Sequence, residues 1–194
     1  MSEVIELADV DALGTGAVGE PGQRAFYIQA RTEDAQLTVL VEKEQVALLA
    51  REAVAFLDRI ADDFPEIPIA VPESEAQLRE PTVPLFRARL IGLGFDPERE
   101  LVLIELRERS SEEEEEEGEE LTPTADDDVT APNAAGAEPG EGDEDGYIAR
   151  IYATRPQVRA MAAKGAEAVA AGRPLCPLCD IPMDPSGHRC PRWN

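Results

Sequence analysis

GTGAVGEPGQRAFYIQAR at residues 14–31 and GLGFDPERELVLIELR at residues 92–107 resemble one another, and the fold we expect rests on this similarity. Each places a proline-containing turn before a run of β-favouring residues, which predicts an antiparallel hairpin. Pro21 and Pro97 hold the same place in the two turns. The strand-like residues after the first turn and those after the second are separated along the chain by the same number of residues as the two prolines. We therefore expect an internal repeat.

The segments after the hairpins repeat as well. QLTVLV (36–41) and YIARIYA (147–153) each predict one more strand, and helical spacing of apolar residues follows near Gln45 and Gln157. These two glutamines are farther apart than the two prolines, and the difference equals the length of an acidic stretch at 111–146. We therefore expect an α+β fold: a mostly antiparallel sheet built from a duplicated hairpin-strand-helix unit, with both helices on that sheet.

The domain organisation follows from this repeat. We expect an α+β body at residues 1–172, with a first half at 1–64, a proline-rich linker at 65–82 and a second half at 83–172. Thr154, three residues before Gln157, has the spacing of a capping box at the start of the second helix. Residues 173–194 would form a small separate zinc knuckle.

The acidic stretch at residues 111–146 holds 16 of the 41 acidic residues of the chain and no lysine or arginine. Such a low-complexity segment does not bury enough apolar surface to fold, so it predicts a disordered insert in the second copy. It is either a passive insert or an electrostatic arm for a basic protein partner. The net charge of −23 argues against nucleic acid and against acidic membrane surfaces as partners.

The sequence also indicates the compartment. No signal peptide pattern follows the N-terminal methionine, and no apolar run reaches the roughly 20 residues that a membrane-spanning helix needs. The three cysteines are too few to pair completely within one chain. We expect a cytoplasmic protein with reduced thiols and no membrane partner.

The glycines of the first hairpin form the pattern G-x-G-x-x-G at residues 14–19, which in dinucleotide-binding proteins opens a helix. Here Glu20-Pro21-Gly22 follows and predicts a turn, so we interpret the pattern as part of a hairpin and not as a nucleotide loop.

All the cysteines and the single histidine lie near the C-terminus, as Cys176, Cys179, His188 and Cys190. The first two fit the ends of one tight turn. The last two are two residues apart and would point to the same side of an extended segment. Together they predict a structural Cys3His zinc site.

Other interpretations of the cluster are weaker. Iron is the main competing metal, since cysteine and histidine bind it as well. A thioredoxin-like Cys-x-x-Cys pair needs a helix after it, which the sequence DIPMDPSG at residues 180–187 forbids. A Cys–His nucleophile pair would leave two thiols without a role, and a chance gathering of unliganded cysteines remains as the last alternative.

The expected function depends on which catalytic groups remain if these four residues bind the metal. If all four ligands hold the metal, no position stays open for water or substrate, and no histidine remains as a general base. The sequence therefore favours a non-enzymatic adaptor or regulatory protein that binds a protein partner. One alternative is an enzyme that uses carboxylates near Gly14–Gly22 and Gly92–Gly94. The other is a zinc-knuckle protein that binds nucleic acid through the cationic and aromatic residues around the site, Arg173, Arg189, Arg192 and Trp193.

Four stretches of the chain resemble the actinobacterial domain-of-unknown-function 3090 family: GAVGEPGQRAFYIQA, VEKEQVALLA, GLGF and GRPLCPLCDIPMDPSGHRCPRWN. The C-terminal stretch is the most specific of these, and the glycine-rich hairpin is the second. The resemblance covers nearly the whole chain except the acidic stretch. It implies a small cytoplasmic protein of a common fold, and it implies no reaction.

Overall fold

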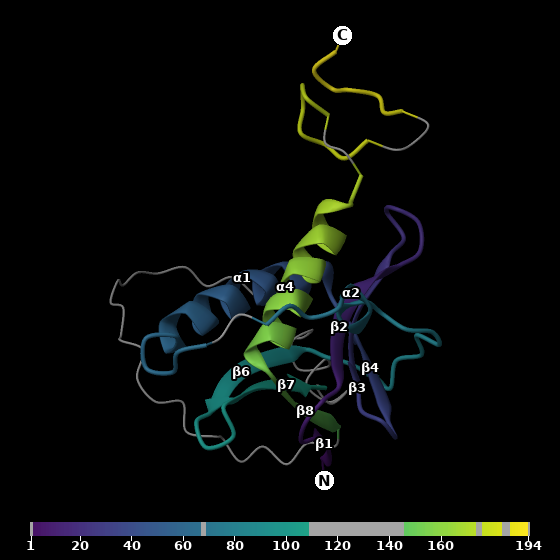
Figure 1. Cartoon of the computed structure of the whole chain (residues 1–194). Coiled ribbons are helices and arrows are strands. Elements are labelled where there is room, and N and C mark those ends of the chain that lie inside the picture. Colours follow the sequence, from purple (N-terminus) through teal and green to yellow (C-terminus); the bar gives the residue numbers. More distant parts are fainter. Residues whose placement is uncertain (1, 67–68, 109–145, 174–175, 184–186, 194) are drawn as a thin grey trace, which may run out of the picture.

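The computed structural model describes residues 2–66, 69–108, 146–173, 176–183 and 187–193 (Figure 1). The described part of the chain forms two four-stranded sheets, two long helices and one short helix. The two long helices pack against each other and against the sheets, so the α+β class predicted from the sequence is confirmed.

The elements follow the predicted order, with one additional strand before each copy and one short helix between the copies. The strands are β1 (Glu3–Leu7), β2 (Ala12–Val18), β3 (Ala25–Arg31), β4 (Gln36–Val41), β5 (Phe86–Arg87), β6 (Leu90–Asp96), β7 (Leu101–Arg107) and β8 (Tyr147–Ala153). The helices are α1 (Lys43–Ile60), α2 (Glu73–Ala76) and α4 (Arg155–Ala170).

The duplicated unit is present in both halves. The antiparallel hairpin β2–β3 is followed by β4 and α1, and the antiparallel hairpin β6–β7 is followed by β8 and α4. The expectation of a single sheet was wrong, because the strands form one sheet in the order β2-β3-β4-β5 and another in the order β1-β8-β7-β6. The three strands of each copy therefore lie in separate sheets.

The two copies exchange their first strands. β1 precedes the first copy but pairs in parallel with β8 of the second, with Leu7 opposite Ile151. β5 precedes the second copy but pairs in parallel with β4 of the first, with Phe86 opposite Val39. Each sheet thus includes a strand from the other half of the chain.

The chain crosses from one sheet to the other directly after each exchanged strand. At the first crossing, the backbone N–H of Val10 donates to the carbonyl of Tyr152 at 3.2 Å. At the second, the N–H of Ala88 donates to the carbonyl of Leu40 at 2.9 Å. Leu40 and Tyr152 have the same separation along the chain as the two matched glutamines, so the crossings are equivalent.

The matched glutamines bind these crossings. The side-chain amide of Gln157 donates to the carbonyl of Val10 at 2.7 Å, and that of Gln45 donates to the carbonyl of Ala88 at 3.3 Å. Each helix therefore holds the point where the exchanged strand of the other half leaves its sheet. This shared role explains why the glutamine recurs at equivalent places in the two copies.

Each glutamine also closes a capping box at the start of its helix. Its side-chain oxygen accepts the backbone N–H of the N-cap residue at 2.8 Å, from Glu42 in α1 and from Thr154 in α4. The capping box predicted at Thr154 and Gln157 is confirmed. Satisfying the exposed N–H groups of the first turn fixes where each helix begins.

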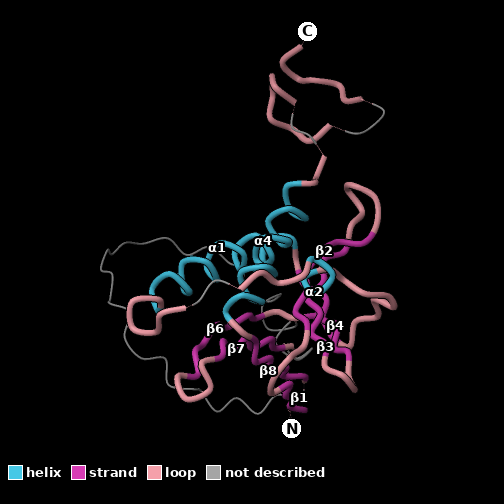
Figure 2. Tube along the Cα trace, viewed as in Figure 1, coloured by secondary structure: helices cyan, strands magenta, loops and turns pink. Residues whose placement is uncertain are grey.

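One hydrophobic core joins both sheets and both long helices, whose arrangement along the chain trace is shown in Figure 2. β7 alternates strictly, with Val102, Ile104 and Leu106 fully buried. α4 approaches closely at Gly165, where an added Cβ would lie 3.0 Å from the side chain of Val46. The buried stripe of α1 is the one predicted from helical spacing: Val46, Leu49, Ala50, Ala53 and Leu57.

The glycines of the first hairpin serve close packing and a turn. Gly14 lies inside β2, where an added Cβ would be 2.6 Å from the carbonyl oxygen of Gln77, so the chain after α2 needs glycine there to cross the strand. Gly19 and Gly22 form the turn with φ of 110° and 101°, which favour glycine. The predicted hairpin is confirmed, because the pattern G-x-G-x-x-G lies in β2 and in the turn that leads to β3.

The predicted disordered insert at residues 111–146 lies outside the described residues apart from Gly146. The chain on either side of it is held together. Arg107 pairs with Ile148 in the β7–β8 ladder, and the N–H of Glu108 donates to the carbonyl of Tyr147 at 2.9 Å. The pairing of β7 with β8 therefore extends almost to the ends of this segment.

Among the described residues, no helix combines the length and the apolar composition that crossing a membrane requires.

Replacing Gln157 by alanine should lower the free energy of unfolding by about 1–3 kcal/mol, because the buried carbonyl of Val10 loses its donor. Urea unfolding followed by circular dichroism measures this change. Gln23→Ala, at an exposed position in the first hairpin turn, is the matched control and should have little effect. Equal stability of the two variants would contradict the role of Gln157 at the crossing.

Replacing residues 111–144 by a short turn should leave the fold intact. The ends of the segment are already joined by the β7–β8 ladder, and shortening a loop should shift the free energy of unfolding by about 2 kcal/mol or less. Cooperative unfolding monitored by calorimetry is the measurement. A deletion variant that no longer unfolds cooperatively would show that the segment belongs to the folded body.

Candidate metal centre

The C-terminal segment, residues 173–194, extends beyond the end of α4 and away from the sheets (Figure 1). Its described residues contain loops and turns and no helix or extended strand. A segment of this length with no regular elements has too little apolar contact to order itself, so its conformation needs another source of stability.

The first two cysteines lie at the ends of a tight turn, as the Cys-x-x-Cys spacing predicted. The N–H of Asp180 donates to the carbonyl of Cys176 at 2.9 Å, and the N–H of Cys176 donates to the carbonyl of Ile181 at 2.9 Å. Asp180 has a φ of 58°, a left-handed conformation in which aspartate is one of the better tolerated residues. The turn brings Cys179 back beside Cys176.

The structure brings all four predicted residues together. The ligand atoms of Cys176, Cys179, His188 and Cys190 all lie within 4.8 Å of one another. The Sγ atoms of Cys176 and Cys190 are 3.9 Å apart, and Cys179 Sγ is 3.4 Å from His188 Nε2. No disulfide links the three cysteines, all of which are described.

This spacing fits a tetrahedral ion. With metal–sulfur bonds of about 2.3 Å and metal–nitrogen bonds of about 2.0–2.1 Å, neighbouring sulfurs should lie about 3.8 Å apart and a sulfur and a nitrogen about 3.6 Å apart. The separations of 3.9 Å and 3.4 Å are close to both values. The cluster can therefore hold a metal ion with four protein ligands.

The electrostatics of the turn favour a thiolate at Cys176. Hydrogen bonds from backbone N–H groups, that of Leu178 first, lower the pKa of Cys176 to about 6 despite burial. Burial raises the pKa of Cys179, and the neighbouring Cys176 adds to this effect. The lowered pKa of Cys176 favours its thiolate, the form that binds a cation, whereas the raised pKa of Cys179 favours its thiol, which must lose a proton to act as a ligand.

The surroundings of the cluster match a structural site. Cys176 and Cys190 are buried, and Cys179 and His188 are half-buried. Four protein donors complete a tetrahedral shell and leave no position for a bound water. Within the described residues, this is the one group of three or more histidine, cysteine or acidic side chains that could hold a metal ion.

The residues predicted for nucleic acid contact in the alternative function have different surroundings. Arg192 donates from Nη1 to the carbonyl of Leu178 at 2.9 Å, so it helps to close the turn around the cluster. Arg173 lies over Gly22 of the first hairpin turn. Arg189 and Trp193 are exposed. Two of the four side chains therefore already have contacts within the protein, which weakens the nucleic acid alternative.

A carboxylate beside the second pair of predicted site glycines is also engaged. Glu105 lies opposite Gly92, and it accepts hydrogen bonds from Arg107 at 2.7 Å and from Arg150 at 2.9 Å. Partial burial raises its pKa, but the hydrogen bonds from Arg150 and Arg107 outweigh this and lower the pKa overall. A carboxylate kept ionised in this way is a poor proton donor, so it does not support the carboxylate-enzyme alternative.

The sequence predicted the four side chains of the cluster, but it did not predict the backbone N–H groups that lower the pKa of Cys176. The N–H of Leu178 lowers the pKa of Cys176, and no residue type in CPLCD signals this contribution. It is a consequence of the turn itself, since every non-proline residue carries the same donor.

Purified protein should carry one metal ion per chain, and Cys190→Ser should lose it, because three remaining donors no longer complete the shell. Elemental analysis after gel filtration measures the ratio. Acidification should release the metal as thiolates and imidazole take up protons. Asp180→Asn is the control beside the cluster and should retain the ion. A Cys190→Ser variant with a full complement of metal would refute the ligand set.

Comparison with known proteins agrees with the sequence resemblance. A family model described as "Protein of unknown function (DUF3090)" matches residues 5–190, which include both copies of the repeat and all four cluster residues. No curated protein and no solved structure matches the chain. Because the match covers all but a few residues at either end, the chain belongs to the DUF3090 family of proteins of unknown function.

Proposed function

We propose that the protein is a non-enzymatic interaction protein whose C-terminal segment is ordered by a structural zinc ion. The observation that carries this proposal is the convergence of Cys176, Cys179, His188 and Cys190 within 4.8 Å. The ion would supply the stability that the C-terminal segment lacks, since zinc binding contributes about 10–16 kcal/mol in zinc-finger peptides.

The donor set favours zinc over iron. Three thiolates and one imidazole form a common tetrahedral zinc shell. The filled d shell of Zn²⁺ imposes no other coordination geometry. Iron bound by sulfur is usually held by four cysteines, and here a histidine takes one of the four places. The identity of the bound element distinguishes these two metals directly.

A catalytic role for the ion has little support. An ion that acts on water or substrate needs an open position, and this cluster offers four protein donors. The chain has a single histidine, so a ligand role for His188 leaves no imidazole for general acid–base chemistry. A structural role for the metal is consistent with both facts.

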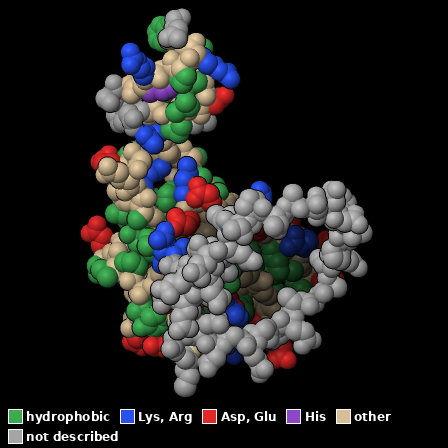
Figure 3. All heavy atoms as spheres, turned by 180° about the vertical axis from the view of Figure 1, so that it is seen from behind, with side chains coloured by type: hydrophobic (Ala, Val, Ile, Leu, Met, Phe, Trp, Pro, Cys, Tyr) green, Lys and Arg blue, Asp and Glu red, His purple; other side chains and the backbone are tan. Residues whose placement is uncertain are grey.

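The C-terminal segment presents large apolar side chains to solvent around the cluster. Leu178 is 49% exposed, Ile181 45% and Trp193 80%. Figure 3 shows hydrophobic and cationic side chains on this part of the molecule, which stands apart from the body. Tryptophan is enriched among the residues that dominate binding energy at protein interfaces, and here it lies on a segment with two further exposed apolar side chains. These residues would contact an apolar patch of a protein partner, and the acidic stretch would add attraction to a basic one.

The test is capture of partners from native lysate with the metal retained, comparing wild type with a Leu178→Ser/Trp193→Ser variant. Val83→Ser, at an apolar position of the body that is 72% exposed, is the matched control. We expect the control to keep the wild-type partner, and both the double variant and the chelator-treated wild type to lose it. Capture of the same partner by the double variant would contradict the proposed surface.

A further inference from the structure

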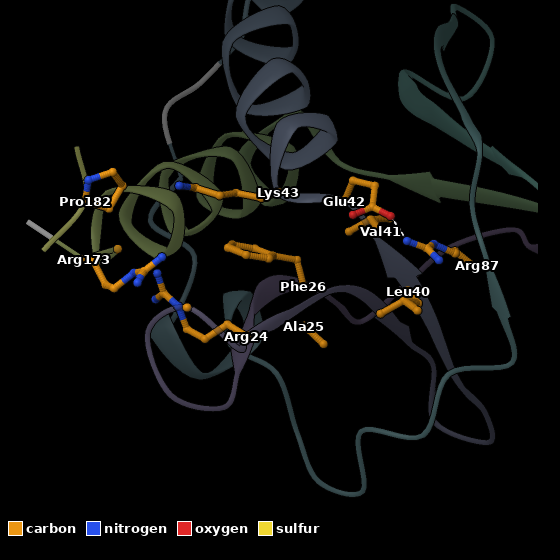
Figure 4. A pocket seen from close by; sticks show the side chains of 12 residues that line it. Arg24, Ala25, Phe26, Leu40, Val41, Glu42, Lys43, Arg87, Arg173 and Pro182 are labelled. Atoms are coloured by element: carbon orange, nitrogen blue, oxygen red, sulfur yellow. Dashed lines mark hydrogen bonds and ion pairs between the residues drawn. The ribbon is translucent and has the colours of Figure 1, made fainter. Parts of the chain in front are cut away.

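A cavity of about 480 Å³ lies on the body beside the C-terminal segment (Figure 4). Its walls come from five parts of the chain: the first hairpin turn with the start of β3, the end of β4 with the start of α1, Arg87 of β5, the residues after α4, and Pro182 of the C-terminal segment. Cavities of this size accommodate small organic ligands. The metal cluster does not contribute its ligand atoms to this cavity.

The cavity is cationic, although the chain carries a net charge of −23. Arg24, Lys43, Arg87 and Arg173 line it, against a single carboxylate, Glu42. That carboxylate already pairs with Arg87 and caps the start of α1. The lining residues therefore carry an excess of positive charge in a protein whose overall field is negative.

Two of these cations approach the same backbone position. A Cβ added to Gly172 would lie 3.5 Å from Arg24 Nη2 and 3.7 Å from Lys43 Nζ. Among the described residues, neither Arg24 nor Lys43 forms an ion pair with a carboxylate. Arg173, which has an interaction of its own within the protein, contributes a third cationic side chain to the lining, and its guanidinium group lies 3.3 Å from a Cβ added to Gly22. Arg24 and Lys43 thus place two positive charges beside the same backbone position, where a bound anion would reduce their mutual repulsion.

The remaining wall of the cavity is apolar. Phe26, Leu40 and Val41 line it from the sheet, and Pro182 lines it from the C-terminal segment. Figure 4 shows the ring of Phe26 between Arg24 and Lys43, and Arg24 also lies over this ring at 5.7 Å from its centroid. A ligand that fits must combine a multiply charged anionic group with an apolar body.

We propose that this cavity binds a small phosphorylated organic molecule, with its phosphate between Arg24, Lys43 and Arg173 and its apolar part against Phe26 and Val41. A phosphate ester carries up to two negative charges and several acceptor oxygens, which suit two guanidinium groups and an ammonium group better than the single charge of a carboxylate. The volume exceeds what an inorganic phosphate fills. This site lies apart from the metal cluster and stands whether or not zinc is the bound ion.

Binding of phenyl phosphate to the full-length protein tests this proposal, with calorimetry as the readout and benzoate as the carboxylate of similar shape. We expect saturable binding of phenyl phosphate that weakens as sodium chloride is added, because the attraction is ionic. Arg24→Gln and Lys43→Gln should each weaken it by about tenfold or more, since each removes a charged hydrogen-bond donor. Lys43→Arg, which keeps the charge, should retain most of the affinity.

Arg51→Gln is the matched control, because Arg51 is an exposed cation of α1 that pairs with Glu52 and does not line the cavity. It should bind phenyl phosphate as the wild type does. Three results would overturn the proposal: no saturable binding of phenyl phosphate, benzoate binding as tight as phenyl phosphate binding, or undiminished binding by folded Lys43→Gln protein. Thermal unfolding of each variant verifies that it is folded, and Lys43 is exposed, so its replacement should not disturb the core.

Discussion

The two copies of the repeat exchange their first strands, and this exchange constrains most other features of the body. Because β1 completes the sheet of β8 and β5 completes the sheet of β4, neither four-stranded sheet is complete with strands from one half of the chain alone. The amide groups of Gln45 and Gln157 then bind the crossing points while capping the helices. Glutamine thus couples the start of each helix to the pairing of distant strands. Both sheets also share one hydrophobic core.

The C-terminal segment is stabilised by different physics. The body buries an extensive aliphatic core, whereas the segment after α4 contains turns and a cluster of soft ligands. The proposed metal ion would supply stability through metal–ligand bonds in place of hydrophobic burial, and these bonds need only four residues in the right place. The two parts meet near Pro182 and Arg173, where the cationic cavity lies. The C-terminal segment therefore contributes to a wall of the cavity, while the four side chains of its Cys3His cluster lie outside the cavity lining.

Charge is distributed in a way that supports both proposals. The acidic residues dominate the chain, yet cations gather around one cavity between the first hairpin, α1 and the end of α4. The proposed site would admit small anions, while the net negative charge of the chain would disfavour extended polyanions. The exposed apolar side chains of the C-terminal segment, including Trp193, remain available for a protein partner.

The local elements could be predicted from the amino-acid sequence alone. The strand at β4, the apolar stripe of α1, the capping box at Thr154 and Gln157, the duplicated unit and the four cluster residues each depend on residues close together in the chain or on a repeated spacing. The number of sheets, the exchange of β1 and β5, and the meeting of Arg24, Lys43 and Arg173 around one cavity were visible only in three dimensions. These features join residues far apart in sequence. Their pairing depends on how the core closes, and no local pattern of residue types encodes it.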